Sequence, residues 1–219
     1  MNLFKSIESI DNSRFKKDDL GMDIGILNID LTQKEIDYLW RCIEKKGERA
    51  NNKLAGHIGN SYDLMDRGDW FWTNTLHPTC LKYAEEYYNI ASYVPTSSFH
   101  NLYLSQWWVN YMKQTEFNPI HHHTGVYSFV IWMKVPYKWT DQNNIPLAKN
   151  SNSKGKVGTF EFLYTDALGK VRCFPIDADS SYEGKMVIFP SPMQHTVYPF
   201  YNCEEERISI AGNILLKTK

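Results

Sequence analysis

Cysteine, net charge and long apolar runs are all scarce in this sequence, and each scarcity excludes a class of protein. The four cysteines lie far apart and none has C-x-x-C spacing, so a disulfide framework is not expected. A formal net charge of −1 and a pI near 6.7 give no long-range attraction to nucleic acid or to an anionic membrane. No apolar run approaches membrane-spanning length, and charges interrupt the N-terminal stretch where a signal peptide would have its apolar core. We therefore expect a cytoplasmic protein with reduced cysteines.

Aromatic residues, in contrast, are abundant. The 219 residues include 14 tyrosines, 11 phenylalanines and 7 tryptophans, a composition that favours sheet over helix as the main architecture. A chain of this length forms one ordinary domain with a sizeable core. We expect a single domain over residues 1–219, in which a helical N-terminal part, residues 1–95, packs on a sheet core, residues 96–219.

Helix signals are concentrated in the N-terminal part. Thr32 and Glu35 have capping-box spacing, and apolar residues then recur at helical spacing. A second helix is predicted to begin near Pro78 and to end before Pro95. The other expectations here are an irregular arm or short edge strand before residue 23, a strand over 23–29 and a loop over 48–69.

Seven strands are predicted after Pro95, because short aromatic and β-branched runs alternate there with Pro, Gly, Asn and Asp. We expect a mainly β architecture, a double-stranded β-helix of jelly-roll or cupin-like type with supporting helices. The polar stretch from Tyr137 to Lys156 interrupts the strands, and its length is typical of a lid or of a mobile loop. The predicted strands are Phe99–Met112, Ile120–Val135, Gly158–Tyr164, Val171–Ile176, Lys185–Pro190, His195–Tyr198 and Arg207–Leu216.

Three consecutive histidines run into an apolar strand in the stretch EFNPIHHHTGVYSFVIWMKVP. Alternate residues of a strand share a face, so His121 and His123 are predicted to point one way and His122, which we expect to be dispensable, the other. His195 follows another strand and a Pro-rich turn, and is the candidate for a third ligand. Three ligands on one face leave open positions at a metal, as in the facial triad of non-haem iron oxygenases. The alternatives are a polar strand end with satisfied histidines or a fortuitous zinc site.

Arg207 favours the functional interpretation. It follows His195 across a stretch with the composition of a hairpin turn, and it shares a strand face with Ser209. An arginine that points into a barrel needs a carboxylate partner, and its planar guanidinium can bind one through two hydrogen bonds. Ser209 offers a further hydroxyl group. The alternatives are simple exposure or a structural ion pair with Glu204, Glu205 or Glu206.

Together, the elements H-x-H, FPS-x-x-x-H-x-V-x-P and R-x-S resemble the iron(II)- and 2-oxoglutarate-dependent oxygenase superfamily. Within it the chain looks most like the prolyl-hydroxylase-like group and the oxygenase-like proteins of marine bacteriophages. The resemblance is densest in NPIHHHTGVYSFVIWMKVPY and in GKMVIFPSPMQHTVYPF through ERISIAGNI. It covers the C-terminal half more closely than the N-terminal half.

The resemblance implies roles for individual residues. His121 matches the first iron ligand, His195 the distal ligand, Arg207 the residue that binds the far carboxylate of 2-oxoglutarate, and Ser209 its hydroxyl neighbour. The superfamily usually has Asp or Glu two residues after the first histidine, where this chain has His123. We expect His123 to be the second ligand, and a carboxylate from a neighbouring strand, Glu116 or Glu161, is the alternative.

The resemblance also implies Fe(II), 2-oxoglutarate and O2 as cofactors, and hydroxylation of a substrate C–H bond with release of succinate and carbon dioxide. The substrate is expected to be a small molecule or a protein side chain, and the compartment the host cytoplasm if the chain is phage-encoded. Two rivals stay open: a cupin-like three-histidine dioxygenase that does not use 2-oxoglutarate, and a non-enzymatic jelly roll for binding or for a virion. Further residues expected at the core or rim of the pocket, rather than in catalysis, are Tyr103, Trp107, Asn110, Tyr127, Ser128, Trp132 and Asn213.

Overall fold

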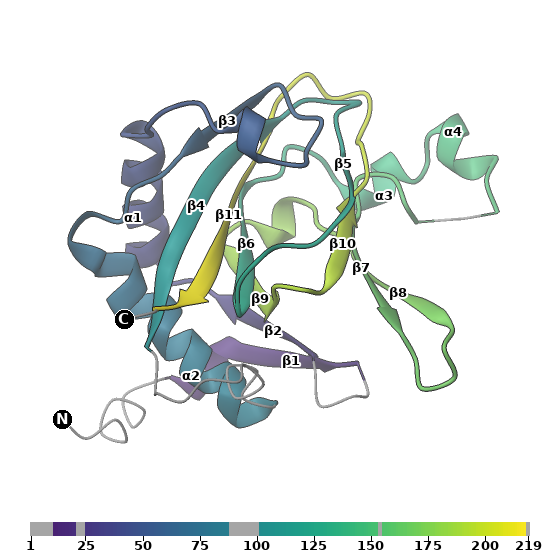
Figure 1. Cartoon of the computed structure of the whole chain (residues 1–219). Coiled ribbons are helices and arrows are strands. Elements are labelled where there is room, and N and C mark those ends of the chain that lie inside the picture. The colour runs from purple at the N-terminus through teal and green to yellow at the C-terminus, as the bar shows by residue number, and fades with distance from the viewer. Residues whose placement is uncertain (1–10, 21–24, 88–100, 153–154, 218–219) are drawn as a thin grey trace.

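The computed structural model describes residues 11–20, 25–87, 101–152 and 155–217, and the strands in these ranges form two antiparallel sheets (Figure 1). In chain order the strands are β1 (Phe15–Asp19), β2 (Gly25–Asp30), β3 (Asn60–Asp63), β4 (Leu102–Met112), β5 (Asn118–His121), β6 (Tyr127–Lys134), β7 (Phe160–Thr165), β8 (Val171–Ile176), β9 (Lys185–Pro190), β10 (Gln194–Val197) and β11 (Arg207–Leu216). Over the described residues, the larger sheet has seven strands in the order β1-β2-β9-β6-β11-β4-β3, and the smaller has four in the order β5-β10-β7-β8. The expectation of a mainly β protein is confirmed.

Two helices pack against one face of the seven-stranded sheet, α1 (Gln33–Glu44) and α2 (His77–Glu86). Their buried side chains form one apolar cluster with alternate residues of β4, β6, β9 and β11. The predicted capping box is confirmed, since the Thr32 amide donates to the Glu35 carboxylate at 2.7 Å and the Glu35 amide donates to the Thr32 hydroxyl at 3.4 Å. The second helix begins near Pro78 as predicted but ends earlier than expected, at Glu86 with Tyr87 as its C-cap, and the rest of the predicted stretch up to Pro95 lies outside the described residues. No helix in the described ranges is both long enough and apolar enough to cross a membrane.

The opposite face of the large sheet meets the four-stranded sheet, and a second apolar cluster fills the space between them. Strand β11 shows how the alternation divides the two interiors. Ile210 packs in the helix-side cluster, whereas Ala211 lies in the cluster between the sheets. Arg207 and Ser209 share the face of Ala211 and line a pocket there. The polar residues of this strand therefore point into the space between the two sheets.

The predicted strand Ile120–Val135 is wrong, because the chain changes sheets within it. β5 ends at His121 in the small sheet and β6 begins at Tyr127 in the large one. Gly125, between them, has a φ of +131°, and a Cβ there would lie 2.8 Å from the carbonyl oxygen of Ile214. Only glycine combines that backbone conformation with so close an approach. His123 is thus a residue of the crossing segment and not of a strand.

The N-terminal part is less helical than expected, because it also contributes strands to the large sheet. β1 and β2 lie at one edge, which agrees with the predicted short edge strand and with the strand predicted over 23–29. β3 lies at the other edge, inside residues 48–69, where the sequence predicts a loop. The stretch Tyr137–Lys156 contains two short helices, α3 (Trp139–Gln142) and α4 (Pro146–Lys149), which project beside the small sheet (Figure 1).

Candidate active site

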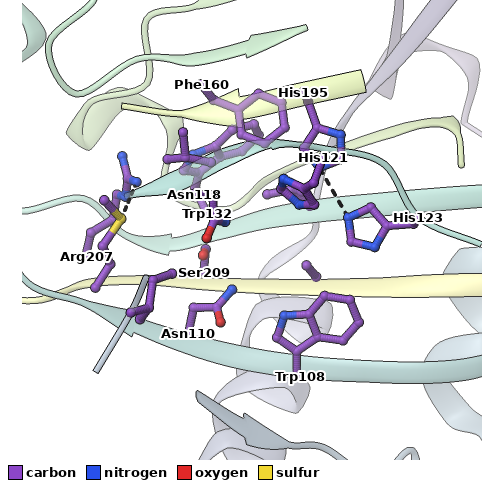
Figure 2. A pocket seen from close by; sticks show the side chains of 15 residues that line it. Trp108, Asn110, Asn118, His121, His123, Trp132, Phe160, His195, Arg207 and Ser209 are labelled. Carbon is purple, nitrogen blue, oxygen red and sulfur yellow. Dashed lines mark hydrogen bonds between the residues drawn. The ribbon is translucent and has the colours of Figure 1, made fainter. Parts of the chain in front are cut away.

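Three histidines converge at one end of the pocket between the sheets (Figure 2). His121 and His195 stand directly opposite each other on the antiparallel strands β5 and β10, so the register brings their rings to 4.3 Å between centroids. His123 joins them from the crossing segment, which is anchored by a hydrogen bond of 2.9 Å from its amide to the Ser191 carbonyl. The ligand atoms of the three side chains lie within 4.8 Å of one another, and the Nε2 atoms of His123 and His195 are 3.2 Å apart.

Hydrogen bonds to backbone carbonyls fix the orientation of two of these rings. The Nδ1 atom of His121 lies 2.8 Å from the Pro119 carbonyl oxygen, and that of His195 lies 3.0 Å from the Met193 carbonyl oxygen. A carbonyl can only accept, so Nδ1 carries the proton in both rings and Nε2 keeps its lone pair. In His195 this lone pair faces the Nε2 of His123 at 3.2 Å, a contact that a bound metal would replace. Metal-binding histidines are typically held by such a bond from the other ring nitrogen. The donor set therefore fits a metal ion.

Burial keeps all three imidazoles neutral. It lowers the pKa of His121 below its usual value, the pKa of His123 to about 4, and the pKa of His195, which is 2% exposed, well below its usual range. The neighbouring imidazoles lower the pKa values of His123 and His195 further. Metals bind histidine in its neutral form, so the cluster is ready to coordinate at neutral pH.

Neither of the two candidate carboxylates belongs to this group. The Glu116 carboxylate accepts hydrogen bonds of 2.8 Å from the backbone amides of Gly59 and Lys113. Glu161 is 1% exposed and forms an ion pair with Lys156, and strand alternation puts it on the opposite face of β7 from the pocket-lining Phe160. Within the described part of the chain, the potential metal-binding group at this position consists of histidines alone.

Arg207 occupies the far end of the same pocket, as Figure 2 shows, and it is 3% exposed. Its guanidinium donates to the Tyr137 hydroxyl at 2.9 Å, to the Gly158 carbonyl at 3.2 Å and to the Met112 sulfur at 2.6 Å. None of the ion pairs between described residues involves Arg207, so the structural ion pair with Glu204, Glu205 or Glu206 is not formed. A buried guanidinium whose neutral partners include a thioether is poised to accept an anion.

The pocket has an inner and an outer hollow that meet at the histidines. The inner hollow extends from His121 and His123 past Ser209 to Arg207, and the outer hollow extends from the same histidines to Lys53 and Asn213. The walls that both hollows share are Ile58, Trp108, Asn110, Asn118, His121 and His123. A ligand in each hollow would therefore approach the histidine cluster from a different side.

Other sequence expectations for the pocket had mixed outcomes. Asn110, Trp132 and Asn213 line it, whereas Trp107 and Tyr127 lie in the helix-side core and do not. Sequence reasoning missed the two neighbours of Arg207, Met112 and Tyr137. Met112 stands opposite Arg207 in the β4–β11 register, a pairing between strands distant in sequence, and no local pattern marks either residue.

The architecture is shared with solved oxygenases. A prolyl-4-hydroxylase from Pseudomonas putida superimposes with a TM-score of 0.51 at 13% identity, covering 89% of this chain and 94% of that one. SnoK, a non-heme alpha-ketoglutarate-dependent carbocyclase of nogalamycin biosynthesis, also gives 0.51 at 9% identity, covering 89% and 80% of the two chains. At such low identity these similarities establish the fold alone. No curated protein matches the sequence.

About half of the sequence matches a known protein family. Residues 106–213, which include all three histidines, Arg207 and Ser209, match the family described as "Putative 2OG-Fe(II) oxygenase". This part of the chain is therefore similar to the 2-oxoglutarate- and Fe(II)-dependent oxygenases. The similarity implies Fe(II), 2-oxoglutarate and O2 as cofactors, and the neutral three-histidine group is compatible with the iron.

Proposed function

We propose that this protein is a 2-oxoglutarate-dependent non-haem iron dioxygenase that hydroxylates a C–H bond of its substrate and releases succinate and carbon dioxide. One observation carries the proposal: a single pocket has three converging histidine nitrogens at one end and a buried arginine without a carboxylate partner among the described residues at the other. This arrangement suits a ligand that coordinates a metal through one end and presents a carboxylate at the other.

His121, His123 and His195 would hold the metal through their Nε2 atoms. When bound, Fe(II) with 2-oxoglutarate supplies the oxidising chemistry that no amino-acid side chain can provide. Arg207 would bind the distal carboxylate of 2-oxoglutarate through two parallel hydrogen bonds, exchanging its contact with the Met112 sulfur for a much stronger one. The Ser209 hydroxyl, on the same face of β11, would donate a further hydrogen bond to this carboxylate.

Tyr137 would position Arg207, because its hydroxyl accepts a hydrogen bond from the guanidinium and itself donates to the Gly158 carbonyl at 3.2 Å. Tyr137 is the first residue of the stretch that the sequence marks as a lid and Gly158 lies two residues beyond its end, so the chain contacts Arg207 at the start of this stretch and just after it. We therefore propose that this stretch responds to 2-oxoglutarate. The apolar rings of Trp132 and Phe160 would line the route between metal and arginine and keep it dry.

We also propose that residues 1–219 fold as a single domain whose sheets form the double-stranded β-helix, or jelly roll. The architectural similarity to Pseudomonas putida prolyl-4-hydroxylase supports this topology. A small molecule or a protein side chain is the proposed substrate.

Succinate formation tests the proposal directly. Protein purified and reconstituted with Fe(II) without oxygen would be given 2-oxoglutarate and then O2, and succinate would be measured for wild type and for His195→Ala. We expect turnover, even without substrate, in wild type only. Metal content would be measured on the same samples, with His122→Ala as the control that retains the metal.

Two results would contradict the proposal. A metal-loaded wild type that neither binds 2-oxoglutarate nor forms succinate would favour a three-histidine dioxygenase of the cupin-like kind. A wild type that retains no stoichiometric metal after anaerobic reconstitution would favour a non-enzymatic binding protein.

A further inference from the structure

Acidic side chains are absent from the walls of both hollows, within the residues that the structure describes. Arg207 brings one positive charge to the inner hollow, and the three histidines are neutral. At the outer mouth, the Lys53 ammonium forms an ion pair of 2.9 Å with Asp63, so the charge of Lys53 is already balanced. The protein therefore supplies the pocket with one uncompensated positive charge and no negative charge.

The cofactors do not remove this imbalance, an argument that rests on the proposed function. Fe(II) and Arg207 together carry three positive charges, and the two carboxylates of 2-oxoglutarate neutralise two of them. A carboxylate ligand at position 123 would neutralise the third positive charge, but the neutral imidazole of His123 does not. A buried charge without a partner is strongly unfavourable even after the site relaxes. The loaded site therefore attracts one more negative charge.

We propose that the substrate supplies this charge, as a carboxylate or another singly charged anionic group that binds in the outer hollow beside His121 and His123. The inner hollow is assigned to 2-oxoglutarate, so the outer hollow is the side from which a second ligand can reach the histidines. A small inorganic anion would satisfy the same charge, and it is the other possible source of this chemistry.

The outer hollow offers hydrogen-bond donors to an anion. Asn213 and Asn110 are 8% and 7% exposed, and their side-chain oxygens accept hydrogen bonds from the hydroxyls of Ser128 at 2.9 Å and Ser61 at 2.7 Å. These bonds orient the two amides so that their NH2 groups remain to donate to a ligand.

Lys53 adds a solvent-exposed cation at the mouth of the outer hollow. The side chains of Lys53 and Asp63 are 55% and 39% exposed, and ion pairs so open to water are weak. Lys53 can therefore exchange Asp63 for the anionic group of a substrate at little cost.

A neutral amide is the competing occupant. Asn118 lines both hollows, and its buried Oδ1 has no hydrogen-bond partner among the described residues. An amide N–H could donate to this oxygen, whereas a carboxylate could not. The two ligand classes thus differ in charge while sharing their shape, and that difference can be measured.

The experiment compares acetate with acetamide, which have the same shape and differ in charge. Zinc-loaded protein saturated with 2-oxoglutarate cannot turn over, because zinc has no redox chemistry. Binding would be followed from the ¹H–¹⁵N NMR signals of the Asn110 and Asn213 side-chain amides, at constant ionic strength set with sodium perchlorate. Acetate is expected to bind at least about tenfold more tightly than acetamide, which corresponds to about 1.4 kcal/mol.

Two variants of equal size isolate the charge at position 123. His123→Asp supplies the missing negative charge, so this variant should lose the preference for acetate over acetamide. His123→Asn has a side chain of the same shape as His123→Asp but no charge, so it should keep that preference. Metal content and folding would be verified for both variants, so that a lost preference is not mistaken for a lost site. Lys53→Met should weaken acetate binding and leave acetamide binding unchanged.

Chloride distinguishes the two sources of negative charge. Acetate that binds more tightly than chloride supports a substrate carboxylate, and chloride that matches acetate supports an inorganic anion and overturns the assignment to the substrate. Equal affinities for acetate and acetamide in wild type, or a preference that persists in His123→Asp, would overturn the whole inference. If zinc-loaded wild type fails to bind 2-oxoglutarate at all, the proposed function fails instead.

Discussion

Replacing Arg207 by methionine should separate the stability of the fold from the binding of 2-oxoglutarate. Arg207 is 3% exposed, and its partners are a hydroxyl, a backbone carbonyl and a thioether rather than a carboxylate. Replacing buried ionic groups by apolar side chains of similar volume is often neutral or stabilising, by about 1–4 kcal/mol. The positive charge of Arg207 is therefore not required for the stability of the cofactor-free protein.

The hydrogen bonds that the arginine loses act in the opposite direction. A bond to a charged group contributes about 1.5–3 kcal/mol. The Tyr137 hydroxyl keeps the Gly158 carbonyl as its partner at 3.2 Å, so neither group is left buried and unpaired. The stability gained by removing the buried charge and the stability lost with its hydrogen bonds are similar in size. We therefore expect the free energy of unfolding of cofactor-free Arg207→Met to lie within about 2 kcal/mol of wild type.

Ligand binding should behave very differently. At a concentration of 100 times its Kd, 2-oxoglutarate stabilises the native state by about 2.7 kcal/mol. For a chain of this size that raises the Tm by about 5–11 °C, since each kcal/mol is equivalent to about 2–4 °C. We expect this rise in the zinc-loaded wild type and none in Arg207→Met, measured by thermal unfolding with and without 2-oxoglutarate.

Arg207→Lys is the control, because it keeps the positive charge but not the planar pair of donors, and its Tm should rise by less than that of wild type. An equal rise in wild type and Arg207→Met would refute the assignment of Arg207 to the co-substrate. A loss of about 3–5 kcal/mol in cofactor-free Arg207→Met would refute the physical reasoning, because a loss of that size is what breaking an existing buried ion pair costs.

Three further predictions concern the segments that position the site. Gly125→Ala should destabilise the protein by about 1–3 kcal/mol or more in urea unfolding, because of its positive φ and its contact with the Ile214 carbonyl. Gly169→Ala, also at positive φ but with nothing within 4 Å, should cost less, and equal losses would show that the close approach is unimportant. Thr32→Ala should cost about 1 kcal/mol through loss of the capping box, whereas Thr32→Ser should restore most of it. Ser209→Ala should weaken 2-oxoglutarate binding by about tenfold, equivalent to one hydrogen bond of about 1.4 kcal/mol, with no change in metal content; unchanged affinity by calorimetry would exclude the hydroxyl from the site.

The sequence predicted most strands because their alternation is local, and it failed where neighbouring segments enter different sheets. Residues 120–135 were predicted as one strand because the histidine run leads directly into the apolar residues of β6; none of the residues of β5 is fully buried, and only Gly125 marks the crossing. β3 was missed because its four residues, Asn60–Asp63, are mostly polar and lie at an edge. A short polar edge strand differs little from a loop in composition.

His121 and His123 lie together as predicted, but not for the reason on which the prediction was based. Strand alternation predicted that His121 and His123 share a face, but His123 is outside the strand. It reaches the cluster because the hydrogen bond to Ser191 and the turn at Gly125 bring the crossing segment back over β10. Contacts of this kind join residues about seventy positions apart in the chain, and no local spacing encodes them.

Strand β11 links the two ends of the site. Arg207, Ser209 and Ala211 face the pocket on alternate positions, so Arg207 and Ala211 lie roughly 13 Å apart at about 3.3 Å per residue. In the register with β4, Ala211 stands opposite Trp108, whose ring stacks on His123 at 5.7 Å between centroids, and Arg207 stands opposite Met112. One strand thus sets the separation between the histidine cluster and the arginine. A slip of one residue would turn Ile208 and Ile210 into the pocket and bury Arg207 against the helices, so the same apolar packing that stabilises the sheet also fixes the length of the ligand that the pocket can hold.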